Sequence, residues 1–221
     1  MPAVATLHWD RTSWREFVVA LEAYSTEISH KPNEDFAYLR CLGLLRGKSM
    51  EDRAARAPHI VEFLNNWNCR LKTTESRMML GPWIREHAER LRALGGVHIL
   101  DDRLPEVAGE VNALYGELMI AGRAAVSNWS DAAASKALHQ LIPELFVMWD
   151  KNIKPFAPDY GDFTLQMHRL GRRLADDAPV DRDDVEQHLQ AHLGKRVRKT
   201  MAKYLDEYNW YVMVGAARPA L

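Results

Sequence analysis

The apolar residues of this chain recur with the period of an α-helix over almost its whole length, and this pattern constrains the fold most. Between residues 14 and 28, for example, apolar side chains fall at spacings of three, four and seven. Comparable stripes cover residues 60–67, 80–94, 104–118 and 185–212. Alternation of apolar and polar residues never persists long enough for a sheet, and only residues 97–100 read as extended. The sequence therefore predicts an all-α protein of about eight to ten helices.

The length of 221 residues suits a single domain, residues 1–221, with a substantial core. Within it we expect two lobes, one of about residues 31–120 and the other of residues 1–30 plus 121–221. No apolar run approaches the roughly 18 residues of a membrane span, and charged residues near the N-terminus interrupt any secretory signal. We therefore expect a cytoplasmic monomer that does not contact a membrane.

Neither a metal nor a cofactor is predicted. The two cysteines, Cys41 and Cys69, lie far apart and form no CxxC pair, so we expect both to be small core residues. Nine histidines are scattered without an HExxH pattern.

Basic residues are concentrated near the C-terminus, although the net charge of the whole chain is only −1. A nucleic-acid partner would therefore need a local patch. Residues 192–212 read as one helix with Val197, Met201, Leu205 and Tyr208 inward. The side chains expected to face solvent and contact phosphates are Lys195, Arg198, Lys199 and, less centrally, Lys203.

The passage SKALHQLIPELFVMWDKNI, residues 135–153, places charges at the two ends of an apolar segment. Its first part reads as a helix that starts near Ser130 or Asp131 and stops at Pro143. Asp150 follows the run LFVMW and precedes another short helical segment. On residue types alone, Asp150 is a helix cap and Lys136 a surface lysine.

This order of a helix with a lysine, a proline-containing link and an apolar run that ends in aspartate resembles the helix-hairpin-helix DNA glycosylases. The match covers about residues 122–153, and the chain has VSNWSDAAASK where the family has a glycine-rich hairpin. The resemblance implies a two-lobed enzyme that removes a modified or damaged base from duplex DNA, in repair or in defence against phage DNA with altered bases. It also implies that Asp150 is catalytic and that Lys136 is the nucleophile if the enzyme has lyase activity.

These residue types suit that chemistry. Breaking an N-glycosidic bond builds positive charge on the sugar, which a fixed carboxylate such as that of Asp150 stabilises while it directs water. A lysine amine can instead attack C1′ and form a Schiff base, which permits strand cleavage.

The base must also leave the duplex and enter a pocket, commonly an aromatic one. Three of the seven tryptophans lie near predicted helix breaks, although core packing explains them equally well. Asparagine and arginine beside the first of them can read a base edge or form a turn. The residues expected to contact substrate are Trp67, Asn65, Arg70, Trp129 and Trp149, with Ser135 and His139 beside Lys136.

Two other classes of function remain open. One is a non-enzymatic helical module that binds DNA or protein. The other is a helical ribonuclease with an Arg-x4–6-His motif, for which the chain offers Arg53 with His59 and Arg182 with His188.

Overall fold

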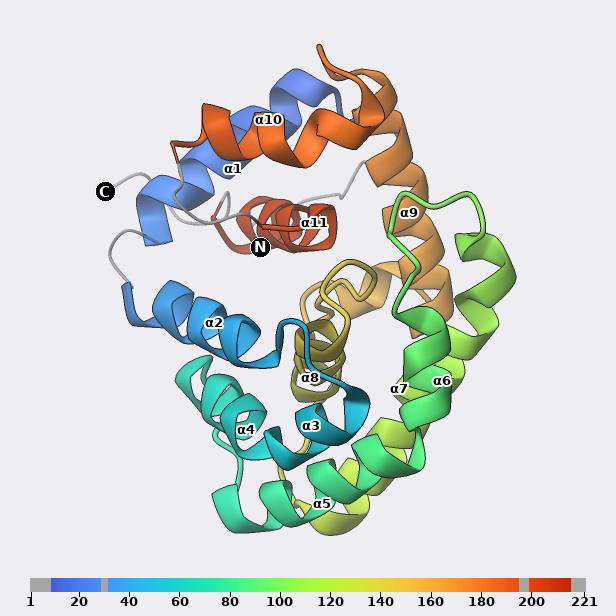
Figure 1. The fold of residues 1–221 in the computed structure, drawn as a ribbon. Coiled ribbons are helices and arrows are strands. Elements are labelled where there is room, and N and C mark those ends of the chain that lie inside the picture. The colour runs from blue at the N-terminus through green and yellow to red at the C-terminus, as the bar shows by residue number, and fades with distance from the viewer. Residues whose placement is uncertain (1–8, 29–31, 195–198, 216–221) are drawn as a thin grey trace.

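A computed structural model describes residues 9–28, 32–194 and 199–215, and within them helices joined by turns are the only regular secondary structure (Figure 1). This confirms the predicted all-α class. The described residues form eleven α-helices and no strand, so the expected number of helices was slightly low. Residues 97–100 form an irregular turn, in which the Ile99 N–H donates to the carbonyl of Glu144 at 2.9 Å.

The helices follow one another with short connections. The first six are α1 (Trp14–Ile28), α2 (Pro32–Leu45), α3 (Met50–Ala55), α4 (Ala57–Asn66), α5 (Thr73–Glu86) and α6 (Ala88–Leu94). The others are α7 (Leu104–Ala125), α8 (Asp131–Leu141), α9 (Tyr160–Asp176), α10 (Val185–His192) and α11 (Met201–Trp210). Short 3-10 turns at Lys154–Phe156 and Arg182–Asp184 precede α9 and α10, and a π-helical turn, Tyr211–Gly215, follows α11.

Several helices begin at a side-chain cap. Ser130, at a predicted start, accepts the N–H group of Ala133, and Ser49 accepts that of Asp52. Asp159 and Thr200 cap α9 and α11 in the same way. Each cap satisfies one of the backbone donors that a helix start leaves without an intrahelical partner.

Helix α11 occupies the middle of the molecule, with α1 and α10 above it and α2 below it in Figure 1. It packs against α1 and α9 on one side. On the other side its Lys203 reaches the ring of Tyr38 in α2. Both faces of α11 are consequently buried, which decides the environment of its charged residues.

One cluster of buried apolar residues includes side chains from all eleven helices. This core joins both halves of the chain. The division into two lobes stays a prediction. In the described ranges, no helix has both the length and the apolar character needed to cross a bilayer.

The predicted helix over residues 192–212 is wrong. Helix α10 ends at His192, and α11 begins only at Met201 behind the Thr200 cap. Lys203 was expected to face solvent, but its side chain is completely buried. The apolar stripe of α11 does face α1 and α9. Its polar face is buried because α2 and Trp67 cover it.

Candidate functional site

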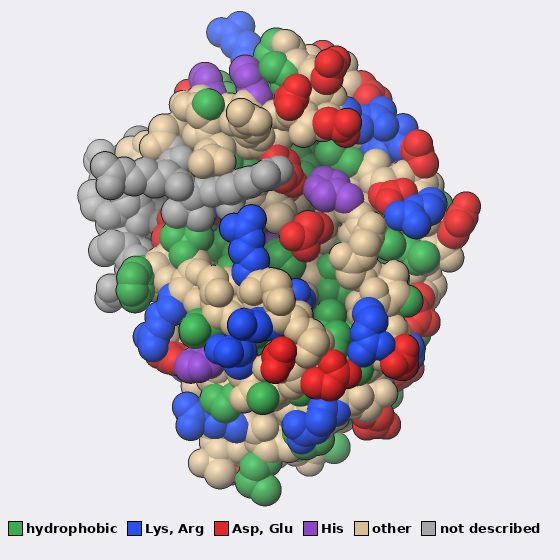
Figure 2. All heavy atoms as spheres, viewed as in Figure 1, with side chains coloured by type: hydrophobic (Ala, Val, Ile, Leu, Met, Phe, Trp, Pro, Cys, Tyr) green, Lys and Arg blue, Asp and Glu red, His purple; other side chains and the backbone are tan. Residues whose placement is uncertain are grey.

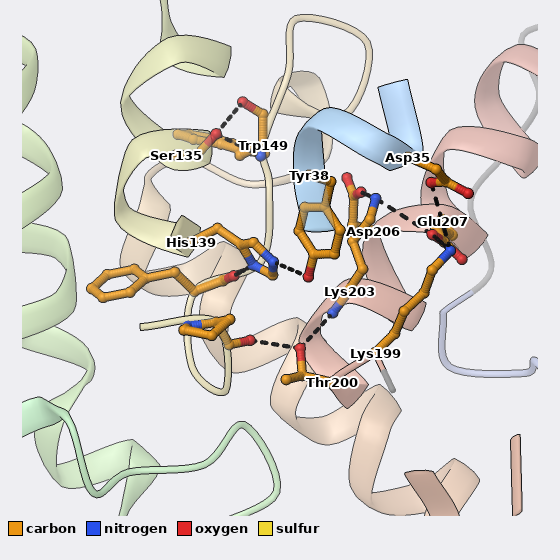
Figure 3. A network of polar contacts seen from close by, with 12 residues as sticks. Asp35, Tyr38, Ser135, His139, Trp149, Lys199, Thr200, Lys203, Asp206 and Glu207 are labelled. Carbon is orange, nitrogen blue, oxygen red and sulfur yellow. Dashed lines mark hydrogen bonds and ion pairs between the residues drawn. The ribbon is translucent and has the colours of Figure 1, made fainter. Parts of the chain in front are cut away.

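Two of the residues singled out in the passage 135–153, Ser135 and Trp149, meet where α8 packs against the link that follows it. The Ser135 hydroxyl accepts the Trp149 N–H at 2.9 Å and donates to the Trp149 carbonyl at 3.1 Å. Both residues are buried. Lys136 follows Ser135 along the chain and Asp150 follows Trp149, so both residues are attached to this junction. Figure 3 shows the contact of Ser135 with Trp149 beside α8.

Asp150 caps the turn that follows it, as its residue type predicted. Its Oδ1 accepts the N–H groups of Asn152 at 2.8 Å and Ile153 at 3.3 Å. The side chain is partly exposed. Its carboxylate forms no ion pair with Lys136, so the two groups leave one junction without neutralising each other.

Lys136 lies partly exposed on α8, with its ammonium 5.0 Å from the centre of the Trp67 ring. Among the described residues, no carboxylate lies within the 4.0 Å of an ion pair with this ammonium. The thiol of Cys69 is close by. Burial raises the pKa of that thiol, and the positive charge of Lys136 opposes the increase. Lys136 is therefore a cation held against an aromatic ring.

The Trp67 ring carries a second cation, Lys203 of α11, at 4.6 Å. The rings of Tyr38 and Tyr24 lie 5.5 and 5.9 Å from the same ammonium. Three aromatic rings thus surround Lys203, and each offers its electron-rich face to a buried charge.

Two carboxylates of α11 neutralise Lys203 (Figure 3). Its Nζ donates to Asp206 at 2.6 Å and lies 3.6 Å from Glu207. Burial alone would lower the pKa of the Lys203 ammonium, but attraction to Asp206 and Glu207 outweighs it, and the pKa is raised. Lys203 stays protonated, which excludes it as an amine nucleophile near neutral pH.

Lys199 belongs to the same network, and its expected role as an exposed phosphate contact is wrong. Its Nζ bonds Glu207 at 2.5 Å and lies 3.9 Å from Asp35, and only 5% of its side chain is exposed. The other two predicted phosphate contacts, Lys195 and Arg198, lie outside the described residues.

His139 is fully buried next to this network and is neutral. Its Nδ1 lies 2.5 Å from the Phe146 carbonyl, which can only accept, so Nδ1 carries the proton. Its Nε2 therefore accepts the hydroxyl of Tyr38 at 2.9 Å. Burial lowers the pKa of His139 to about 4, which keeps the ring uncharged at neutral pH. His139 therefore connects α8 with α2 and with the segment that follows α8, and it does not face solvent.

Two of the three predicted tryptophans are core residues. Trp129 is buried against Gly122, where any added Cβ would collide with its ring. Trp149 is buried and stacks on Phe163, with ring centres 5.7 Å apart. Trp67 alone of the three is partly exposed.

The residues around Trp67 form a turn. The Asn65 side chain accepts the Leu71 N–H at 2.6 Å and donates to the Leu71 carbonyl at 3.2 Å. This closes a tight loop in which Asn68 and Arg70 adopt left-handed backbone angles, with φ of 61° and 51°. Asn65 therefore has a structural role, whereas the Arg70 side chain is exposed.

The two Arg–His pairs of the ribonuclease alternative do not form shared sites. Arg53 donates to the carbonyls of Lys48 and Leu141, whereas His59 lies beside Glu62. Arg182 bonds Asp176, whereas His188 packs near Trp14.

Sequence reasoning missed Tyr38, Asp206 and Glu207 as partners in the buried network. A usable signal was present, because Lys203 precedes the two carboxylates by three and four positions, the spacing of neighbours on one helix face.

No family model, curated protein or solved structure matches this chain. Within the ranges that the structure describes, no group of three or more histidine, cysteine, aspartate or glutamate side chains is arranged to hold a metal ion.

Proposed function

We propose that the protein is a DNA glycosylase that hydrolyses the N-glycosidic bond of a modified or damaged base in duplex DNA. The observation that carries the proposal is the double hydrogen bond between the Ser135 hydroxyl and the Trp149 main chain. This contact keeps the residue before Asp150 against the residue before Lys136. The resemblance of residues 122–153 to helix-hairpin-helix glycosylases requires these two side chains to leave neighbouring points.

Asp150 would stabilise the positive charge that develops on the sugar and direct the attacking water. Two backbone N–H groups hold its Oδ1, which fixes the plane of the carboxylate. A carboxylate fixed in advance costs no reorganisation when the charge develops, and for this reason it favours the transition state. Oδ2, without a hydrogen bond to any described residue, is the oxygen that would face C1′ or the water.

Lys136 would contact the phosphate or the departing base, or attack C1′ as an amine if the enzyme has lyase activity. It is suited to either role because no carboxylate neutralises it and it is partly exposed. Trp67, on which it rests, is the one of the three predicted tryptophans that is partly exposed, and is therefore the best suited of them to stack on a base.

The test is incubation of the full-length protein with duplexes that each carry one modified base, including bulky phage-type modifications, followed by quantification of abasic sites. We expect Asp150→Asn to remove the activity. Asparagine caps as well as aspartate does, so the turn should survive the loss of charge. Asp159→Asn is the matched control, because Asp159 caps α9 through the same kind of bond at 2.8 Å.

Borohydride trapping of the protein on DNA distinguishes the two roles of Lys136. Trapping that disappears in Lys136→Gln but persists in Lys154→Gln assigns a Schiff base to Lys136. Lys154 is a suitable control, because it also lies over a tryptophan, 5.6 Å from the Trp149 ring. Full activity in Asp150→Asn would contradict the mechanism. Absence of abasic product on every duplex would instead favour a non-enzymatic binding module.

A further inference from the structure

His87 lies at the corner where α5 ends and α6 begins, and its ring contacts α7. Only 8% of the residue is exposed, and the ring stacks on that of Trp83, with ring centres 4.4 Å apart and planes 16° from parallel. These helices form the lower right part of the molecule in Figure 1, and Figure 2 shows acidic and basic side chains interspersed over that part of the face. A buried histidine in such surroundings can be charged or neutral, and its hydrogen bonds decide which.

Both ring nitrogens of His87 face groups that can only accept a hydrogen bond. Nδ1 lies 2.9 Å from the carbonyl oxygen of Trp83, and Nε2 lies 2.8 Å from Oε2 of Glu117. Hydrogen bonds from Arg90 and His87 lower the pKa of Glu117, so its side chain is an ionised carboxylate at neutral pH. A neutral imidazole has one N–H and satisfies only one of these acceptors, whereas an imidazolium satisfies both.

Two other histidines show how differently the same contacts can be combined. One ring nitrogen of His98 accepts the N–H of Leu100 at 3.1 Å, and the other lies 2.9 Å from Glu186. His139, described above, donates to a carbonyl and accepts a hydroxyl. A single N–H satisfies each of these rings. Among the described histidines with partners at both ring nitrogens, His87 is the one that needs two N–H groups.

The charges around the ring also favour the imidazolium. Arg90 bonds Glu117 at 2.5 Å and Glu110 at 2.6 Å. With a charged ring this group of four side chains has two positive and two negative charges; with a neutral ring one negative charge is left over. The face of the Trp83 ring adds attraction for a cation. Burial and the charge of Arg90 oppose protonation of His87, but the two carboxylates outnumber Arg90, and one of them touches the ring.

The helices α3 and α4 also pack against this corner, through α5 and α6. Their charged side chains have other partners: Glu51 bonds Arg92, Asp52 bonds Ser49, Arg53 donates to main-chain carbonyls, and Glu62 bonds Arg40 and lies 3.7 Å from His59. Arg85 and Glu86, at the end of α5, are exposed. The ring of His87 is therefore governed by the groups of the preceding paragraph.

We propose that His87 is a proton-dependent latch between the α5–α6 corner and α7, closed while its ring is an imidazolium and released when the second proton leaves. The neutral ring would leave one acceptor facing another. An unfolded chain loses this proton near pH 6.5, where an ordinary histidine titrates. Because the folded protein holds the proton at higher pH, the latch stabilises the fold at low pH and this contribution is lost as the pH rises. Neither Lys136 nor Asp150 takes part, so the latch does not depend on the proposed glycosylase reaction.

The decisive measurement is a long-range ¹H–¹⁵N NMR spectrum of the full-length protein labelled with ¹⁵N-histidine, recorded between pH 6 and pH 9. At pH 7 we expect protons on both ring nitrogens of His87, whereas His98 should carry its proton on Nε2 and His139 on Nδ1. The signals of His87 are identified by their absence in His87→Gln. An unprotonated ring nitrogen in His87 at pH 7 would overturn the proposal.

Urea denaturation at pH 6 and pH 9 measures what the latch contributes to stability. Between these values the folding equilibrium constant of the natural protein should fall about tenfold more than that of His87→Gln. His168→Gln is the matched control, because His168 is also 8% exposed and bonds a carbonyl, that of Ile99, but has no ion pair with any described carboxylate. It should keep the pH dependence of the natural protein, and equal pH dependence in the natural protein and His87→Gln would contradict the latch.

A second variant keeps the test open if His87→Gln does not fold. Glu117→Gln removes the negative charge at Nε2 but keeps an oxygen that can accept. The ring of His87 should then lose its second proton at lower pH than in the natural protein, and the shift of its NMR signals identifies them. A titration of His87 that Glu117→Gln leaves unchanged would also overturn the proposal.

Discussion

Two lysines share the ring of Trp67, one from α8 and one from α11. Lys203 of α11 lies 4.6 Å from the ring centre and Lys136 of α8 lies 5.0 Å from it. Lys203 is completely buried and bound to Asp206 and Glu207. Lys136 is partly exposed and has no carboxylate partner among the described residues.

The difference shows that burial and contact with an aromatic ring do not by themselves indicate chemistry. The charge of Lys203 is balanced within the fold, and its raised pKa keeps it protonated, so its role is structural. The charge of Lys136 is not balanced, which leaves it available to a polyanion. The following predictions test this contrast, from the largest expected effect to the smallest.

The largest effect is expected from Lys203→Met. Removing one member of a buried charge network leaves the Asp206 carboxylate buried without its closest cation, so the free energy of unfolding should fall by about 3–5 kcal/mol. Urea denaturation followed by circular dichroism measures this. The double variant Lys203→Met with Asp206→Leu removes both charges and should recover part of the loss. A loss below about 1 kcal/mol in Lys203→Met would show that the network is not tightly coupled.

The buried His139 predicts a pH dependence. Its pKa is about 4 in the folded protein, against an ordinary value of 6.5, so the unfolded chain binds more protons between these values. Stability should therefore fall as the pH is lowered from about 6.5 to about 4, by about 3 kcal/mol from this group. Denaturation at several pH values should show a flatter profile for His139→Asn. An unchanged profile for His139→Asn would mean that the ring is not buried as described; His59→Asn, at a partly exposed position, is the control.

Ser135→Ala tests the contact that joins the two ends of the passage. The variant leaves the buried Trp149 N–H without its acceptor, so the free energy of unfolding should fall by about 1–3 kcal/mol. If Asp150 acts as proposed, base removal should also slow, since the contact positions Asp150. Ser76→Ala is a matched buried control, because that hydroxyl only donates to the Lys72 carbonyl, which also accepts a backbone N–H. Equal losses in the two variants would contradict a special role for Ser135.

The smallest effect on stability is expected from Lys136→Met. A partly exposed cation–π contact contributes about 0.5–1 kcal/mol, so the variant should unfold at nearly the same urea concentration as the natural protein. The affinity for duplex DNA should nevertheless fall, because an unbalanced positive charge is lost. A stability loss comparable with that of Lys203→Met would remove the distinction between the two lysines.

Local signals predicted α8 well. A serine that can cap, three alanines with high helix propensity and a proline at position 143 define its start and end, and the helix runs from Asp131 to Leu141. The cap role of Asp150 was also predictable, since it depends only on the next three residues.

The burial of Lys199 and Lys203 could not be predicted from periodicity. The stripe of apolar residues in α11 predicts one buried face, and the charged residues fall on the other. That other face is buried because α2 and Trp67 cover it, and these residues lie more than a hundred positions away along the chain. For the same reason no local pattern shows that Trp67 meets both lysines or that His87 meets Glu117.

The packing of α1 against α11 has a consequence for the order in which the chain can fold. The hydroxyls of Thr12 and Tyr208 bond at 2.7 Å across 196 residues, and Trp9 donates to Asn209 at 2.8 Å. A ribosome that adds 5–20 residues per second makes α1 roughly 10–40 s before its partner. During that interval the apolar face of α1, with Phe17 and Leu21, has no α11 to cover it. Helix α1 is thus made well before the helix that covers it, and its apolar face has to wait for α11 before it can be buried.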